Sequence, residues 1–198
     1  MTQRIPLFPL NTVLFPGGCL PLRIFEARYL DMVSQCLRTD QGFGVCLIRK
    51  GSEVGGAAQC FETGTYARIV DWNQQADGLL GIKVSGEQRF RIIHSAISAN
   101  KLLEAEIEWL QDEAPLDLPD DFQPLREMFI QLVQQLRLPY QDELEKSADA
   151  VWLGHRLAEL LPFELEIKQA LLELPDSIER MQHLLTLVNE TDKFDQYH

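Results

Sequence analysis

Few residues of this sequence have the types and the spacing that metal chemistry requires. The chain contains four histidines: His94, His155, His183 and His198. They are too scattered for the H-x-x-x-H spacing of a zinc site. Glu104, Glu106 and Glu108 alternate along an expected strand, but side chains on one face of a single strand point the same way and seldom enclose an ion. We therefore expect a solvated face of glutamates and no metal site.

Motifs of nucleotide-dependent and hydrolytic enzymes are also missing from the sequence. There is no G-x-x-x-x-G-K-[ST] phosphate loop and no G-x-S-x-G nucleophile turn. Gly42-x-Gly44 starts a dinucleotide-binding pattern, but Leu47 stands where its third glycine belongs. The glycine-rich segment 51–56 forms either an anion-binding nest or, as is more common, a solvated loop. We therefore predict that the chain is not an enzyme and holds no cofactor.

A surface that binds a polypeptide is the remaining kind of site. Long arginine stems can rim an apolar groove, and an extended peptide can dock at a sheet edge through main-chain hydrogen bonds and apolar pockets. The residues that could serve in this way are Arg23, Arg28, Phe61, Tyr66, Arg68, Trp72, Arg89 and Arg91. Each also has a purely structural interpretation, because aromatic residues on strands usually lie in the core and arginines on strands are usually solvated.

The net charge of −12 is confined to the second half of the chain. Residues 1–111 carry 11 basic and 11 acidic side chains, whereas residues 112–198 carry 7 and 19. An acidic half repels phosphate backbones and anionic membranes. The break in composition near residue 112 also favours a domain boundary there.

Composition and cysteine usage indicate a globular cytoplasmic protein. Hydrophobic residues make up 45% and charged residues 24% of the chain, which is ordinary for such proteins. No apolar run approaches the length of a membrane span, and the N-terminus lacks the pattern of a signal peptide. The cysteines are Cys19, Cys36, Cys46 and Cys60. They form no C-x-x-C pair, so we expect reduced, buried thiols.

The opening stretch, Ile5 to Tyr29, predicts a dense succession of short elements. Residues 5–9 are apolar with two prolines, which favour a sheet edge or a strand end. Residues 12–15 are β-branched and aromatic and predict a strand. Pro16-Gly17-Gly18 predicts a turn, and residues 20–25 predict a further strand whose alternation Phe25 breaks.

A helix is expected to follow that strand from Glu26. Leu30, Val33 and Leu37 fall at i, i+3 and i+7 and predict its apolar face. Glu26 stands where the helix dipole favours a negative charge.

The segment FPLNTVLFPGGCLPLRIFEARYLDMV resembles the opening of the Lon N-terminal domain family, also called the Lon substrate-binding domain. That family's pattern looks like PL-x-x-x-V-x-FPG-x-x-LPL-x-(I/V)-FE-x-R-Y. The matching positions are Pro9, Leu10, Val13, Phe15, Pro16, Gly17, Leu20, Pro21, Leu22, Phe25, Glu26, Arg28 and Tyr29. The segment LPFELEIKQALLELPDSIERMQHLLTLV is similar to the helical end of the same module. The chain is too short to hold the ATPase and peptidase domains of a full Lon protease.

The resemblance implies recognition of unfolded or peptide-like protein segments, including a role as an adaptor in proteolysis or quality control that works with a separate protease. It also implies a barrel related to PUA-type barrels, some of which bind RNA. RNA binding is thus the alternative function, with Arg49-Lys50, Arg68, Arg89 and Arg91 as its basic patch. The acidic second half argues against it, because RNA affinity rests largely on neutralising phosphates.

The remaining sequence predicts an α+β protein of two domains. Strands are expected at 42–49, 61–72 and 102–110, with a hairpin of 79–84 and 87–93 around Ser85-Gly86. Residues 1–112 should form a small, mostly antiparallel β-barrel with one inserted helix, and the resemblance implies that this barrel is PUA-like.

A proline-rich linker, residues 114–119, should lead to an acidic four-helix bundle at residues 118–198. Proline-bounded apolar stripes predict its helices at 122–136, 142–161, 163–174 and 176–188.

Overall fold

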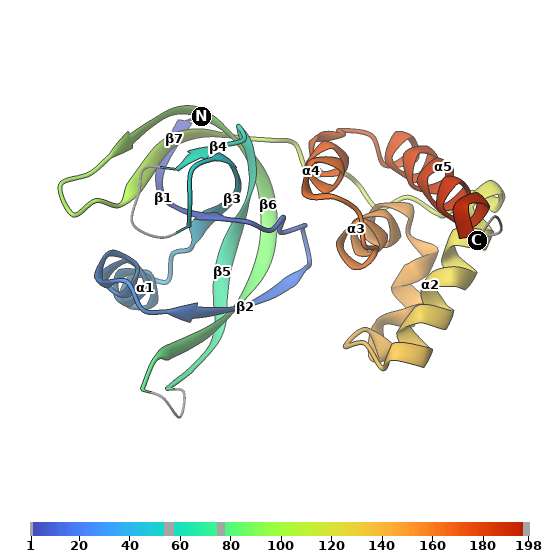
Figure 1. The fold of residues 1–198 in the computed structure, drawn as a ribbon, viewed down its shortest axis with the longest axis horizontal. Coiled ribbons are helices and arrows are strands. Elements are labelled where there is room, and N and C mark those ends of the chain that lie inside the picture. Colours follow the sequence, from blue (N-terminus) through green and yellow to red (C-terminus); the bar gives the residue numbers. More distant parts are fainter. Residues whose placement is uncertain (1, 54–57, 75–77, 196–198) are drawn as a thin grey trace. The chain divides into compact units, whose positions relative to one another are not determined.

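The computed structural model describes residues 2–53, 58–74 and 78–195 (Figure 1). The chain divides into two compact units, Met1–Asp112 and Glu113–His198. Within the described ranges, no helix is long and apolar enough to cross a membrane.

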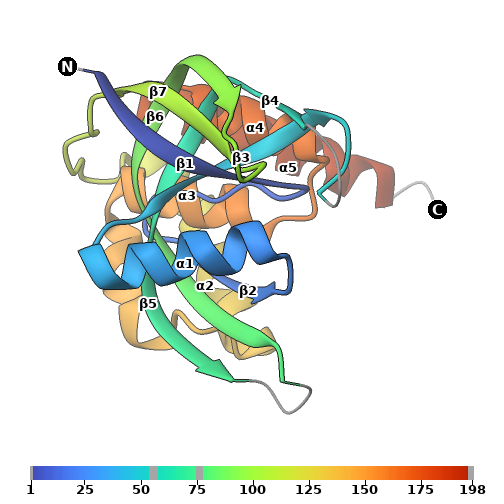
Figure 2. The same cartoon turned by 90° about the vertical axis from the view of Figure 1, so that its left-hand side faces the viewer.

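The first unit is a β-sheet that closes into a ring, with one helix inserted (Figures 1 and 2). Its elements are β1 (Thr2–Leu10), β2 (Cys19–Ile24), α1 (Ala27–Thr39), β3 (Phe43–Lys50), β4 (Gln59–Cys60), β5 (Thr63–Gln74), β6 (Leu80–Ile97) and β7 (Leu103–Trp109). The strand order is β1-β7-β6-β5-β3-β4, β2 pairs with β6, and a parallel pairing of β1 with β3 closes the ring. The other pairings are antiparallel. The expectation of a mostly antiparallel sheet with one inserted helix is confirmed.

Strand β1 lies within the ring, whereas the prolines predicted a sheet edge or a strand end. Residues 2–6 pair with β7, and residues 7–10 pair with β3. The change of partner comes directly after Pro6. A proline that lacks an N–H donor is tolerated at such a point, because neither ladder has to continue through it.

The predicted strand at residues 12–15 and the predicted turn at Ser85-Gly86 are both wrong, and one contact explains both errors. Residues 11–18 form an irregular segment, and β6 runs without a break through Gly86. Gly86 donates to the carbonyl of Gly18 and its own carbonyl accepts from Gly17, both at 2.8 Å. A Cβ atom on Gly86 would lie 2.4 Å from the carbonyl oxygen of Phe15. Glycine is therefore needed here for close approach and not for a turn.

Of the three residues predicted for the apolar face of α1, Val33 is buried and Leu30 and Leu37 are not, so the face that packs on the core is rotated from the predicted one. The buried side chains are Tyr29, Met32, Val33 and Cys36, whereas Leu30 is 38% and Leu37 43% exposed. The buried set has the i, i+3, i+4, i+7 spacing of a helical face. Tyr29 packs edge-on against Phe8 with ring centroids 4.1 Å apart. Contact with β1 therefore selects this face.

The second unit is helical. Its elements are the 3₁₀-helices η1 (Asp120–Phe122) and η2 (Gln141–Ala148) and the α-helices α2 (Gln123–Leu136), α3 (Ala150–Leu160), α4 (Leu165–Glu173) and α5 (Ser177–Asp195). The helix predicted at 142–161 is divided into η2 and α3. Asp149 ends the first and caps the second, because its side chain accepts from the N–H of Val151 at 2.9 Å. Packing centres on α3, which contacts η2, α4 and α5.

A buried ion pair ties the start of the second unit to α5. Arg180, whose side chain is 0% exposed, donates to both carboxylate oxygens of Glu113 at 2.6 and 3.1 Å. It also donates to the carbonyls of Leu171 and Leu174 at 3.0 and 2.7 Å. A buried charge with this many hydrogen bonds is tolerated, and removing one partner of such a pair would leave the other uncompensated.

We predict that Gly86→Ala destabilises the first unit by about 1–3 kcal/mol, because the new methyl group overlaps the backbone at Phe15. Urea unfolding followed by tryptophan fluorescence measures this in a Trp152→Phe background, where Trp72 and Trp109 report on the first unit. Ser85→Ala, one residue earlier on the same strand, is the control and should change stability much less. Equal effects of the two substitutions would contradict the close-approach explanation.

Candidate functional site

The junction between β2 and α1 is held by Arg28. Its Nη1 donates to the carbonyl of Lys101 in the β6–β7 turn at 3.1 Å, and its Nη2 lies 2.9 Å from Glu26. The guanidinium also stacks over the ring of Tyr29, 4.6 Å from the centroid. Burial raises the pKa of Tyr29 from 10.0 to about 12, and Arg28 opposes this rise. Arg28 thus positions the start of α1 and is poorly placed to bind a ligand.

Exposed apolar side chains gather on two parts of the first unit. Among the described residues of the first unit, the large apolar side chains that are more than one-third exposed are Phe25, Leu30, Leu37, Val70, Trp72, Ile93 and Ile97. The first five come from the β2–α1 junction, α1 and β5, and the last two come from the far part of β6. We call the first five the α1–β5 surface.

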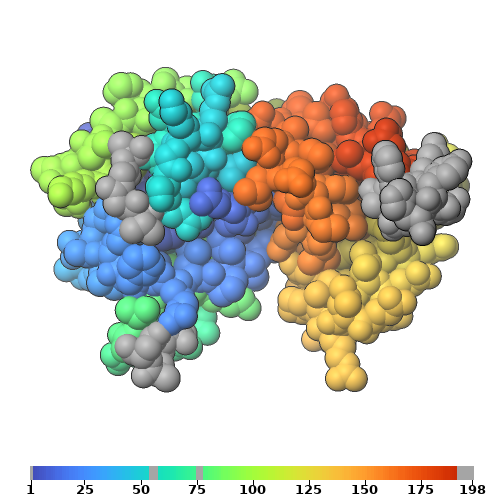
Figure 3. Space-filling view, viewed as in Figure 1, coloured from blue at the N-terminus to red at the C-terminus, as the bar shows by residue number. Residues whose placement is uncertain are grey.

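Helix α1 meets β5 at its C-terminal end and runs across the direction of that strand, because Figure 1 shows α1 end-on and β5 in the plane of the view. At the C-terminal end of α1, the Nη1 of Arg68 on β5 donates to the carbonyl of Asp40 at 3.0 Å. At the end of β5, Gln74 pairs with Leu80, which pairs in turn with Ile24 just before the junction. In the space-filling view, the blue surface of α1 and β2 adjoins the surface of β5 and β6 (Figure 3).

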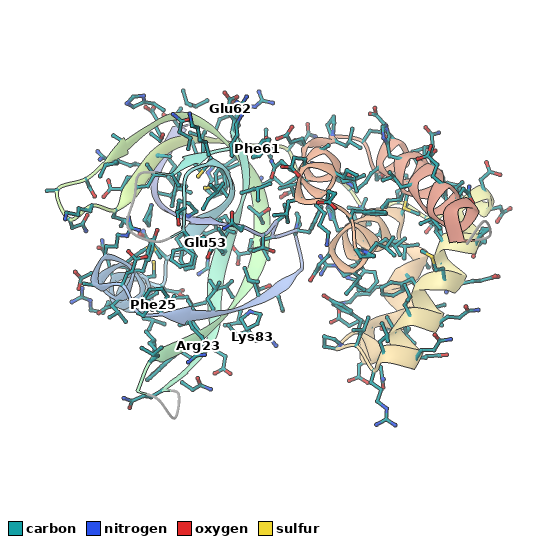
Figure 4. All side chains as sticks on the ribbon, viewed as in Figure 1. Arg23, Phe25, Glu53, Phe61, Glu62 and Lys83 are labelled. Atoms are coloured by element: carbon teal, nitrogen blue, oxygen red, sulfur yellow. The ribbon has the colours of Figure 1, made fainter. Side chains whose placement is uncertain are left out.

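Basic side chains flank the α1–β5 surface. Arg23 lies opposite Gly81, and Lys83 lies opposite Pro21, so the two cations are diagonal neighbours on one face of the β2–β6 pair. Figure 4 shows both near Phe25. Arg68 donates to Glu87 at 2.8 Å as well as to Asp40. The register places Trp72 on the face that it shares with Ile82 and Leu22, whereas Arg23 and Lys83 lie on the opposite face.

The structure separates the eight residues proposed from the sequence. Arg23, Arg68 and Trp72 lie at the α1–β5 surface, where Trp72 is 60% exposed. Arg28 lies beneath it in the junction. The remaining four are Phe61, Tyr66, Arg89 and Arg91.

Tyr66 and Arg89 are buried and serve the fold. The Tyr66 hydroxyl accepts from the N–H of Gly42 at 2.5 Å, and its ring packs edge-on against Trp109. Phe61 is partly buried beside β4 and lies apart from Arg23 (Figure 4). Arg91 is exposed on the second half of β6, opposite Glu108 of β7.

Sequence reasoning missed four residues of the α1–β5 surface: Phe25, Leu30, Leu37 and Val70. Phe25 gave a signal, because it breaks the alternation of the preceding strand. Leu30 and Leu37 gave none, since an apolar residue on a helix reads the same whether it faces the core or a ligand.

The described residues offer little for a metal ion or a cofactor. They contain no group of three or more histidine, cysteine, aspartate or glutamate side chains arranged to hold a metal ion. Two depressions of about 280 and 490 Å³ share the Arg4–Glu104 ion pair, whose atoms lie 2.7 Å apart.

The profile of the family described as "ATP-dependent protease La (LON) substrate-binding domain" matches residues 4–190. The chain belongs to this family. The match confirms the resemblance seen in the opening stretch and extends it through both units. A solved Lon N-terminal domain protein from Xanthomonas campestris is 35% identical, with a TM-score of 0.78 over 93% of this chain and 98% of that one. The N-terminal domain of the Mycobacterium avium complex Lon protease has a TM-score of 0.67 at 17% identity, which supports the fold alone.

Full-length Lon proteases match over the same region. Lon protease 2 of Myxococcus xanthus is 30% identical over 195 residues, and the match covers 94% of this chain and 24% of that protein. The Lon protease of Escherichia coli K12 is 26% identical, with 93% and 24% covered. This Lon substrate-binding domain therefore spans about a quarter of the length of these relatives.

We predict that Tyr29 makes the first unit lose stability in alkali. Between its unfolded pKa of 10.0 and its folded pKa of about 12, the folded state holds the phenol proton more tightly, so unfolding releases it and stability falls as pH rises. Tyr29→Phe keeps the ring and removes the proton. The difference in unfolding free energy between wild type and this variant should stay constant below about pH 9. By about pH 12 the wild type should have lost roughly 2 kcal/mol of stability relative to the variant. A pH-independent difference would show that the phenol is not buried.

Proposed function

We propose that this Lon substrate-binding domain is a non-enzymatic module that binds unfolded or peptide-like protein segments at the α1–β5 surface. The observation that carries the proposal is that four large apolar side chains of the first unit, Phe25, Leu30, Leu37 and Trp72, are exposed. Large apolar side chains grouped on a surface mark interaction sites more often than chance exposure. An unfolded segment supplies the apolar side chains that would cover them.

Features of β2 suit an extended peptide. In the described part of the chain, β6 is its one strand partner, and Phe25 directly follows it. A peptide could add main-chain hydrogen bonds along β2 and place an apolar side chain against Phe25. Arg23 and Lys83 share one face of the β2–β6 pair, so they favour acidic residues on that side of a strand added to β2.

The finer roles expected from the sequence are part of the same proposal. We propose that the chain works in the cytoplasm and passes its bound segment to a separate protease. We also propose that residues 1–112 and 118–198 are independent domains, the first a PUA-like barrel and the second an acidic bundle. Expression of residues 1–112 alone tests the last point, because an independent domain would keep a cooperative unfolding transition.

RNA binding is the less favoured alternative. Arg68 already pairs with Asp40 and Glu87, and Arg89 is buried. These two arginines therefore add little to a basic patch, and the chain carries a net charge of −12. A salt-sensitive shift with structured RNA would nevertheless replace the peptide proposal if no polypeptide bound.

We predict that Trp72→Ala weakens binding of a fluorescently labelled, permanently unfolded polypeptide by roughly tenfold or more, the usual loss when a central aromatic anchor is removed. Fluorescence anisotropy titration measures the affinity. Ile97→Ala is the matched control, because Ile97 is 54% exposed but lies outside the α1–β5 surface. Losses of equal size in both variants, or none in Trp72→Ala, would refute this location of the site.

A further inference from the structure

Two cysteines that are distant in sequence lie side by side in the first unit. Cys46 is in β3 and Cys60 is in β4, where Cys60 pairs with Ile48, two residues beyond Cys46. The N–H of Phe61 donates to the carbonyl of Leu47 at 3.0 Å and continues the same register. Residues two apart on a strand share a face, so both thiols point to the same side. Both also pack against one apolar cluster.

The two thiols differ in exposure and in acidity, and each shifts the pKa of the other. Cys46 is 1% exposed, whereas Cys60 is only partly buried. The hydrogen bond from Cys46 lowers the pKa of the Cys60 thiol, although burial opposes this. The same hydrogen bond, together with burial, holds the pKa of Cys46 well above its ordinary value. Cys60 is thus the more accessible thiol and the readier to react as a thiolate.

We propose that Cys46 and Cys60 form a site of reversible oxidation by hydroperoxides, at which Cys60 reacts first and Cys46 completes a disulfide. Both thiols are free in this structure, so it shows the reduced form. The proposal goes beyond peptide binding and does not depend on it.

The chemistry requires only a hydroperoxide. The Cys60 thiolate attacks one peroxide oxygen, the O–O bond breaks, and with one proton taken up the products are a cysteine sulfenic acid and water (an alcohol, for an alkyl hydroperoxide). The Cys46 sulfur then attacks the Cys60 sulfur, the S–O bond breaks, and the Cys46 proton leaves with the hydroxyl as water. In total, two thiols lose two electrons to one peroxide.

The other two cysteines lack these features. Cys36 donates to the carbonyl of Gly42 at 3.6 Å, and burial raises its pKa to about 11. Cys19 is exposed at the start of β2 and belongs to neither the apolar cluster nor the β3–β4 pair.

The β4 strand is only two residues long and lies at the end of the strand order. Such an element can shift enough to bring the two sulfurs to bonding distance.

Mass spectrometry of the native full chain after hydrogen peroxide treatment tests the proposal. Trypsin cleaves after lysine and arginine, so each cysteine falls in its own peptide: 5–23, 29–38, 39–49 and 51–68. We expect a disulfide between peptides 39–49 and 51–68, loss of both free thiols, and recovery of both with a reductant. The midpoint of thermal unfolding should rise by several degrees in the oxidised form.

Single variants separate the two roles. Cys46→Ser should leave Cys60 as a sulfenic acid that a dimedone probe captures, whereas Cys60→Ser should leave Cys46 unreacted. Cys19→Ser is the control and should form the same disulfide as wild type. Irreversible oxidation of Cys60 without a link to Cys46, or links that run through Cys19, would overturn the proposal. So would labelling of Cys60 by iodoacetamide no faster than that of Cys36.

Discussion

The fold of the first unit depends on the close approach of residues 15–18 to Gly86. Because Gly86 has no side chain, the backbone of this segment can bond to β6 on both sides of one residue. Strand β6 therefore continues for 18 residues and pairs with β2, β5 and β7. The same contact buries Phe15 and directs the chain into β2. The segment that distinguishes the family thus works first as a structural device.

This segment also prepares the surface to which we assign function. Arg28 fixes the start of α1 by bonding across to Lys101, and Tyr29 anchors the helix against β1. Because that face packs against the core, Leu30 and Leu37 stay exposed on the flank of the helix. A change in the orientation of α1 would therefore alter both the core packing and the surface that we propose for binding.

Local pattern predicted the elements whose residues interact mainly with near neighbours. The strand at 42–49, the strand at 102–110 and the C-terminal helices were found from periodicity and proline boundaries. Features that depend on contacts between distant parts of the chain could not be predicted in this way. The sequence of Ser85-Gly86 predicts a turn, and only the contact with residues 15–18 shows why a glycine is needed there. The proximity of Cys46 to Cys60 follows from the register of β3 and β4, which the sequence does not reveal. The burial of Tyr66 and Arg89 likewise depends on ring closure.

The central claim is that unfolded polypeptide binds at the α1–β5 surface, and photo-crosslinking tests it most directly. An unfolded polypeptide carrying a benzophenone group would be bound to the native chain, irradiated, and the attachment sites mapped by mass spectrometry. The account predicts crosslinks in tryptic peptides 24–28, 29–38 and 69–83, which contain Phe25, the exposed leucines of α1, and Trp72. Crosslinks confined to residues 92–101 or to residues 113–198 would contradict it.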